Sequence, residues 1–178
     1  KQEMFIGDVT KKSDVIKSTR NCDIVYNFAG ISDIGKANLN PIATVDQNIK
    51  GNLNILDAAV QNKVSQYIFA STVYVYSQSG GFYRCSKQAS ELFIEEYARK
   101  HNLKYTILRF GTLYGPRSNE DNSIYYFIKQ ALNNKKINYE GKADSIREYI
   151  HVRDAAKVCL DILDDEYINQ HFVITGAQ

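Results

Sequence analysis

The strongest constraint on the fold is that short apolar runs alternate with helical patterns along the whole chain. The apolar runs predict strands or strand-like segments at residues 4–9, 23–30, 67–71, 104–110, 137–140, 147–152 and 171–175. Segments with helical spacing lie near residues 15–16, 41–60, 83–100 and 123–133, and a further one ends at about residue 163. Parallel strands need long crossovers, usually helices, so this alternation indicates βαβ units. The sequence therefore predicts an α/β fold with a mostly parallel sheet.

The composition excludes several kinds of partner. The chain of 178 residues has 22 Lys and Arg against 20 Asp and Glu, a net charge of +2, and its basic residues are scattered. A nucleic-acid or membrane-surface partner calls for a clustered basic patch, so neither is expected. No apolar run approaches the roughly 20 residues of a membrane span. The three cysteines form no CxxC pair, and the three histidines share no metal-ligand spacing. We therefore expect a soluble, cytoplasmic protein without a metal.

Polar residues gather where the predicted strands end. Asp8, Gly30 and Thr72 each end or follow an apolar run, and another loop begins after Arg109. In an open parallel sheet, ligands bind beyond the carboxyl ends of the strands. These positions therefore predict one functional site at that edge of the sheet.

Tyr83 and Lys87 are spaced for joint chemistry. Residues i and i+4 share one face of a helix, so the two side chains are neighbours. A phenol has a pKa of about 10, but an ammonium ~4 Å away contributes about 4 kcal/mol at an effective dielectric of 20, or roughly three pK units. The pKa of Tyr83 is then expected at about 7, where a general base works best. On spacing alone, Tyr83 is more often simply a half-buried tyrosine of a helix. The polar residues at the strand ends, Thr72 among them, favour a proton-handling site instead.

Several segments resemble, in chain order, the signatures of one family. They are GDV (7–9), VYNFAG (25–30), DQNIKGNLNILDAA (46–59), FASTVYVYS (69–77), YRCSK (83–87), LRFGTLYGPR (108–117) and REYIHVRDAA (147–156). Together they resemble the extended short-chain dehydrogenase/reductase family, in its nucleotide-sugar epimerase/dehydratase branch. The resemblance implies a Rossmann-like, doubly wound, mostly parallel sheet with part of a small C-terminal substrate-binding region. Residues 1–115 would form a partial dinucleotide-binding domain, and 116–178 substrate-binding elements interleaved with the last strands.

The same resemblance assigns roles to individual residues. It implies a catalytic set of Thr72, Tyr83 and Lys87, with NAD as cofactor and a nucleotide-diphosphate sugar as substrate. The implied cofactor-binding residues are Asp8, Val9, Phe28, Ala29, Gly30, Asn48, Tyr83, Lys87 and Phe110. The implied substrate-binding residues are Thr72, Asn122, Tyr139 and Arg147. Arg147 would grip the diphosphate, a bidentate task that suits a guanidinium group.

The sequence departs from the family pattern at its beginning. The family opens with a strand, a GxxGxxG turn and a helix whose N-terminus seats the pyrophosphate, but Gly7, Gly30 and Gly35 are too widely spaced for that turn. We therefore expect a fragment that lacks the first βαβ unit. The residue that selects NAD or NADP would lie in that unit, so NADP stays open beside NAD. Only ten residues separate Thr72 from Tyr83, and Gly111 stands where epimerases commonly have Asn.

The residues after Thr72 narrow the expected chemistry. The family's 4,6-dehydratases place Asp and Glu there to eliminate water, whereas this chain has Val73 and Tyr74. The sequence therefore favours an NAD-dependent nucleotide-sugar epimerase, acting at C4 by reversible hydride transfer. An NAD(P)H-dependent keto-sugar-nucleotide reductase is the alternative. A non-catalytic dinucleotide-binding relative is less favoured, because a binding module has no need of the Thr-Tyr-Lys set.

Two helices predict an interface between copies of the chain. In the helix that carries Tyr83, an apolar stripe at Ala89, Leu92, Phe93 and Tyr97 lies opposite the Tyr83–Lys87 face, which is expected to face a cleft. The second helix is predicted to begin at Pro41, with Asn40 as its cap, and to run to Val60. Family members often dimerise through these helices, so a homodimer is expected. The alternative is that the stripe packs within the monomer.

Overall fold

The fold is built on a four-stranded parallel sheet. A computed structural model describes residues 3–139, 141 and 144–176. The sheet has the order β1-β2-β3-β6 and consists of β1 (Ile24–Asn27), β2 (Gln66–Thr72), β3 (Tyr105–Phe110) and β6 (Gln170–Ile174). A separate two-stranded parallel sheet pairs β4 (Thr112–Tyr114) with β5 (Tyr149–His151). The expected α/β class with a mostly parallel sheet is confirmed.

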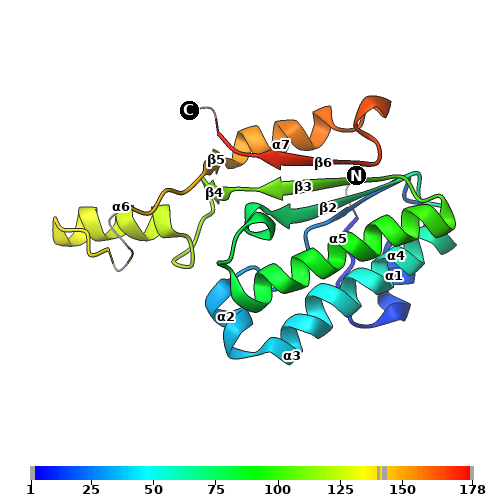
Figure 1. Cartoon of the computed structure of the whole chain (residues 1–178), viewed down its shortest axis with the longest axis horizontal. Coiled ribbons are helices and arrows are strands. Elements are labelled where there is room, and N and C mark those ends of the chain that lie inside the picture. Colours follow the sequence, from blue (N-terminus) through cyan, green and yellow to red (C-terminus); the bar gives the residue numbers. More distant parts are fainter. Residues whose placement is uncertain (1–2, 140, 142–143, 177–178) are drawn as a thin grey trace.

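Helices cover both faces of this sheet (Figure 1). The helices are α1 (Lys12–Ser18), α2 (Ile34–Leu39), α3 (Pro41–Thr44), α4 (Gly51–Gln61), α5 (Gly81–His101), α6 (Ser123–Asn134) and α7 (Val152–Asp161). A π-helical segment, η1 (Val45–Lys50), joins α3 to α4, and 3-10 turns form η2 (Val73–Tyr76) and η3 (Asp165–Tyr167). The α4 and α5 helices lie on one face and α7 on the other, while α6 projects beyond the ends of the strands.

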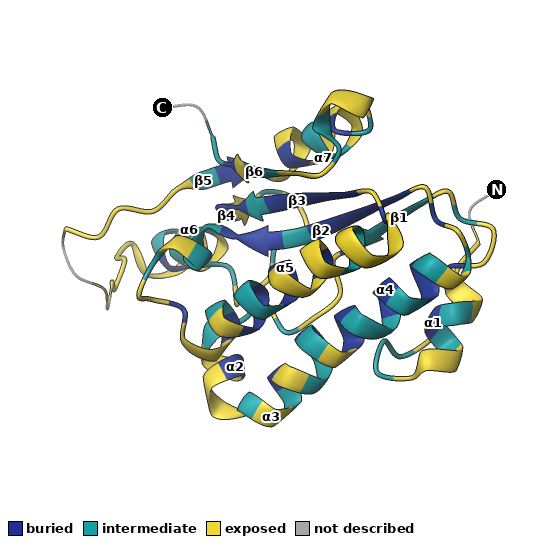
Figure 2. Cartoon of the chain, turned by 45° about the vertical axis from the view of Figure 1, so that its right-hand side comes forward, coloured by how far each residue is buried: buried dark blue, intermediate teal, exposed yellow. Residues whose placement is uncertain are grey.

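The core has two layers because successive strand residues point to opposite faces. Tyr67 and Phe69 of β2 pack with Ile94 of α5 in one layer, and Ile68 packs with Ala155 of α7 in the other. The central strands are therefore buried on both sides, as Figure 2 shows. This explains why β2 and β3 read as nearly continuous apolar runs.

The helix predicted from Pro41 begins as expected. Asn40 Oδ1 accepts a hydrogen bond from the Ala43 amide at 3.0 Å, and Pro41 occupies the first helical position, where a missing N–H costs little. The π-helical segment within this helix brings Asn48 into the buried interior. Sequence periodicity did not predict α2, whose start is capped by Asp33 through the Lys36 amide at 2.6 Å.

Two predicted strands are absent from the described residues. At residues 4–9, Met4 and Ile6 are 86% and 87% exposed with no partner strand, and the Asp8 carboxylate accepts from the Thr10 amide and hydroxyl at 2.9 and 2.8 Å. This local bonding stabilises a turn instead. At residues 137–139 the Asn138 amide donates to Gln130 of α6 at 2.8 Å rather than to a strand; residue 140 lies outside the described residues. Both strand predictions were wrong for the described part.

The apolar stripe of α5 is exposed only in part, since Tyr97 packs against the core. The Tyr83–Lys87 face is buried against the sheet and continues through Ser90 and Ile94, whereas Leu92 and Phe93 of the apolar stripe are 66% and 41% exposed. The alternative that the stripe packs within the monomer is therefore wrong for these two side chains. No helix in the described ranges is both long and apolar enough to cross a membrane.

Candidate active site

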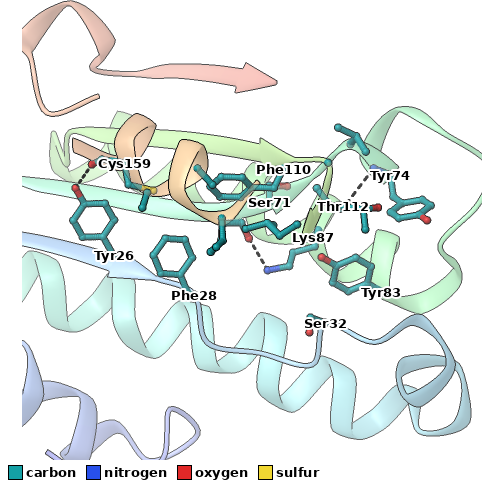
Figure 3. Close-up of a pocket in the computed structure, with 18 of the residues that line it drawn as sticks. Tyr26, Phe28, Ser32, Ser71, Tyr74, Tyr83, Lys87, Phe110, Thr112 and Cys159 are labelled. Atoms are coloured by element: carbon teal, nitrogen blue, oxygen red, sulfur yellow. Dashed lines mark hydrogen bonds between the residues drawn. The ribbon is translucent and has the colours of Figure 1, made fainter. Parts of the chain in front are cut away.

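A cavity of about 810 Å³ opens at the carboxyl ends of β2 and β3. Its walls come from these strand ends, from η2, from the first turns of α5 and from α7 (Figure 3). Thr72, Tyr83 and Lys87 all line it. The three residues that the sequence singled out as catalytic are therefore brought to one cavity, in the place where parallel sheets bind ligands.

Lys87 is held beneath the cavity by the backbone of β2. Its ammonium donates to the carbonyl of Ala70 at 2.7 Å and lies 4.6 Å from the centre of the Phe69 ring. The residue is only 6% exposed. Burial lowers the pKa of Lys87 to about 8, because a charged group loses its hydration there, and the carboxylate of Glu91 opposes this change. The pKa of Lys87 therefore lies closer to neutral pH than that of an ordinary lysine.

Tyr83 is buried, and its environment contradicts the predicted pKa near neutrality. Burial raises the pKa of the phenol, and the hydroxyl of Thr72 opposes this only in part. The Lys87 ammonium lies 5.9 Å from the centre of the Tyr83 ring and is directed at the Ala70 carbonyl. The expected lowering of the Tyr83 pKa by Lys87 was therefore wrong for the protein without bound ligands.

Thr72 is the last residue of β2 and the N-cap of η2. Its hydroxyl accepts from the Tyr74 amide at 3.3 Å, which caps the 3-10 turn, and the residue is 4% exposed. Strand alternation points Ser71 to the α5 face and Thr72 to the α7 face. The turn then places Tyr74 on the cavity wall.

The predicted cofactor residues divide into two groups. Phe28 and Phe110 line the large cavity together with Tyr83 and Lys87. The ring centres of Phe28 and Phe110 lie 6.3 Å apart. Asp8, Val9, Ala29 and Asn48 are not among its lining residues, and Gly30 lines a neighbouring cavity.

Asn48 supports the loop after β1 rather than the cavity wall. Its amide group bonds the Ile31 amide at 2.7 Å, the Ile31 carbonyl at 3.0 Å and the Ser86 hydroxyl at 2.9 Å. Gly30 passes directly over it with a φ of +143°, and a Cβ there would lie 2.6 Å from Asn48 Oδ1. The two residues thus fix the loop against α5.

The predicted substrate residues lie along a series of adjoining cavities. The large cavity shares Asn122 with a polar cavity of about 530 Å³, which in turn shares Arg147 with a small one of about 200 Å³ that Tyr139 lines. Arg147 also donates to the Tyr74 hydroxyl at 3.3 Å. Asn122 itself caps α6 through the Tyr125 amide at 3.1 Å and donates to a backbone carbonyl, so its side chain is already engaged. The three cavities therefore adjoin one another through shared lining residues.

Sequence reasoning missed two residues of the site. Tyr74 was noted only as a replacement for an acidic residue, yet it lines the large cavity and contacts Arg147. Glu91 was not singled out, although its position four residues after Lys87 places it on the same face of α5. That spacing was the available signal.

Comparisons with known proteins agree with this fold. The sequence profile of the NAD dependent epimerase/dehydratase family matches residues 1–175. The low-salt glycan biosynthesis protein Agl12 of Haloferax volcanii is 27% identical over 83% of this chain and 52% of its own length. The UDP-glucuronate 4-epimerase of Thermodesulfobacterium geofontis is 29% identical over 80% of this chain and 48% of its own length. The chain thus spans about half the length of these relatives.

Solved structures show the same fold. The UDP-glucose 4-epimerase of Thermotoga maritima, solved with UDP-glucose, superposes with a TM-score of 0.88 at 22% identity. The match covers 97% of this chain and 62% of that one.

Proposed function

The chain belongs to the NAD-dependent epimerase/dehydratase family, and from that premise we propose that the protein is a nucleotide-sugar epimerase that acts at C4. The observation that carries the proposal is the convergence of Thr72, Tyr83 and Lys87 on one cavity that continues towards Arg147 and Tyr139. A sugar in the large cavity, a diphosphate beside Arg147 and a base beside Tyr139 would follow this series in order.

The residues present fit the reactive end of a dinucleotide. Lys87 uses one of its three N–H donors on the Ala70 carbonyl, which leaves donors for ribose hydroxyls, and Phe28 and Phe110 supply apolar walls. When bound, oxidised NAD supplies a hydride acceptor and a positive charge beside the site. No GxxGxxG turn occurs in this sequence, so cofactor binding is proposed for the intact protein.

Each residue of the catalytic set has a distinct task in this proposal. Tyr83 accepts the proton of the C4 hydroxyl and later returns it, while Thr72 hydrogen-bonds the same oxygen and holds it in line. Lys87 stays protonated below its pKa of about 8 and favours the phenolate form of Tyr83 electrostatically. Since burial alone raises the Tyr83 pKa, the phenol becomes a base only when positive charge gathers around it.

The lining of the large cavity supports epimerisation over dehydration. No Asp or Glu occurs among the described residues that line it, and elimination of water from the sugar requires a positioned acid and base. Redox at the sugar carbon needs only the proton carrier and the hydride acceptor. The same residues also suit a keto-sugar reductase, which the assay below separates by its cofactor balance.

The intact protein should be incubated with UDP-, dTDP- and GDP-hexoses and NAD, with products separated by chromatography and reduced nicotinamide followed by absorbance. A C4 epimer that forms without net NAD reduction is the expected result. Stoichiometric consumption of NAD(P)H with a keto-sugar would establish the reductase instead. Bound cofactor with no conversion of any sugar would reject both.

Replacing Arg147 by Ala is expected to raise KM for the nucleotide-sugar by roughly 10- to 100-fold with kcat nearly unchanged, because hydrogen bonds to charged groups contribute about 1.5–3 kcal/mol. Arg147→Lys keeps the charge but loses the planar fork, so an intermediate KM is expected. Arg153→Ala, on the exposed side of α7, serves as the control. Equal KM values for the Arg147 and Arg153 variants would remove Arg147 from the substrate site.

The exposed apolar residues of α5 support the proposed homodimer. Leu92 and Phe93 are exposed. Ile42 of α3 and Val45 of η1, two segments that pack against α5, are also 72% and 48% exposed. A Phe93→Glu variant places a charge in this apolar surface and is expected to halve the mass in analytical ultracentrifugation, since an unpaired interfacial charge is costly. Leu132→Glu, on exposed α6, should leave the mass unchanged. Wild-type protein that sediments as one protomer would contradict the dimer.

A further inference from the structure

We propose that Glu91 is the positioning residue for Lys87: it holds the Lys87 face of α5 against the ends of β2 and β3 and keeps the ammonium charged. The proposal rests on the catalytic role proposed above for Lys87. Nothing in the sequence signatures or in the proposed chemistry assigns Glu91 a task, because it does not line the large cavity.

The contacts of Glu91 join three elements. Its carboxylate accepts from Arg109 Nε at 3.1 Å and from Arg109 Nη2 at 2.6 Å, a two-pronged pair from β3. The hydroxyl of Ser71 in β2 donates to the same carboxylate. Ser71 directly precedes Thr72, and Arg109 directly precedes Phe110. One side chain of α5 therefore fixes the last residues of both strands that carry the cavity wall.

The pair is buried, so its geometry is strongly specified. The side chains of Glu91 and Arg109 are 7% and 16% exposed. Removal of one member of a buried ion pair leaves an uncompensated charge, which the fold tolerates poorly. The buried pair therefore anchors α5 over β2 and β3 one helical turn away from Lys87.

The network also reaches the turn that follows Thr72. The Arg109 guanidinium lies 4.8 Å from the centre of the Tyr76 ring and donates to the Tyr76 hydroxyl. Tyr76 ends η2, the turn that also carries Tyr74 on the cavity wall. Glu91 is thus connected through Arg109 to the η2 turn as well as to the end of β3.

Besides holding α5 against the strands, Glu91 acts electrostatically on the charge of Lys87. From α5, Tyr83 and Glu91 face the same side as the ammonium; from β2 come the Ala70 carbonyl and the Phe69 ring. Arg109 and His171 stand behind Glu91, with their side-chain nitrogens 2.7 Å apart. Glu91 is the acidic group that opposes the loss of the Lys87 proton.

The test is a titration of Lys87 in the intact protein by NMR of 13C-labelled lysine, with the signal assigned by its absence from Lys87→Met. In Glu91→Gln the carboxylate is lost and Arg109 is left positive. The titration midpoint of Lys87 is then expected to fall by about one pH unit. This is the size expected for the loss of a negative charge one helical turn away that Arg109 already neutralises in part. The alkaline limb of kcat/KM should move by the same amount.

Two further variants keep the result interpretable. Glu95→Gln removes a half-exposed carboxylate one turn further on, near His171, and should leave the Lys87 midpoint in place. The double variant Glu91→Gln, Arg109→Met removes both charges, so its midpoint should lie between those of the wild type and Glu91→Gln; it serves also if the single variant fails to fold.

If both Glu91 variants lost stability but kept the wild-type titration midpoint of Lys87, the proposal would be overturned. Glu91 would then have only a structural role. The titration needs no turnover. Wild-type protein that converts no sugar would therefore reject the proposed function, while the midpoints would still decide the role of Glu91.

Discussion

Replacing Tyr83 by Phe is expected to lower kcat by roughly 10³-fold, because the variant retains every binding contact of the ring and loses only the group that carries the proton. The ring is buried and burial raises the pKa of its hydroxyl, so the wild-type side chain is a neutral phenol at rest. Phe fills the same space, and loss of one hydrogen bond costs about 1 kcal/mol of stability. Fold and cofactor binding should therefore persist, as measured by circular dichroism and by cofactor titration.

Tyr74→Phe is the matched control for this change. Its hydroxyl belongs to the same cavity wall but is bonded to Arg147 rather than aimed at a reacting group. We expect a rise in KM of less than about 10-fold and little loss of kcat, as for one hydrogen bond. If Tyr83→Phe kept a tenth or more of wild-type kcat, Tyr83 would not be the proton carrier, whatever the behaviour of Tyr74→Phe.

The parts of the site that the sequence predicted are those that local rules determine. Strand and helix alternation placed Thr72 at a strand end and put Tyr83 and Lys87 one helical turn apart, and the structure brings all three to one cavity. These relations depend on periods of two and 3.6 residues and not on the packing of distant segments. The capped start at Asn40 was predictable for the same reason.

The electrostatic state of the site was not predictable in this way. The direction of the Lys87 ammonium depends on the Ala70 carbonyl, which only the packing of α5 on β2 brings within 2.7 Å. The pKa of Tyr83 was therefore expected to fall, whereas burial raises it. Likewise Glu91 meets Arg109 across 18 residues of sequence, and no periodicity indicates that pairing. Spacing identified the chemical groups, and tertiary packing determined their charges.

Replacing Lys87 by Met is expected to stabilise the fold while it abolishes most turnover. The pKa of Lys87 lies at about 8 in the folded protein and at 10.5 ordinarily. At 1.36 kcal/mol per pK unit this displacement corresponds to roughly 3 kcal/mol. Loss of the bond to the Ala70 carbonyl offsets about 1 kcal/mol. A net gain of about 2 kcal/mol in the free energy of unfolding is therefore expected at about pH 7, by urea denaturation.

The size of this stabilisation should fall with pH in a defined window. Between pH 8 and 10.5 the unfolded chain holds a proton on Lys87 that the folded protein has released, so wild-type stability rises with pH there. The cost of the buried charge is fully present below pH 8 and is gone above 10.5. The gain in the free energy of unfolding from Lys87→Met should thus shrink across this window. Lys157→Met, at an exposed site on α7, should change stability little at any pH.

If Lys87→Met were no more stable than the wild type at about pH 7, burial of the Lys87 ammonium would not destabilise the fold. A stabilised but inactive variant would instead mean that this fold keeps a destabilising charge because the reaction needs it.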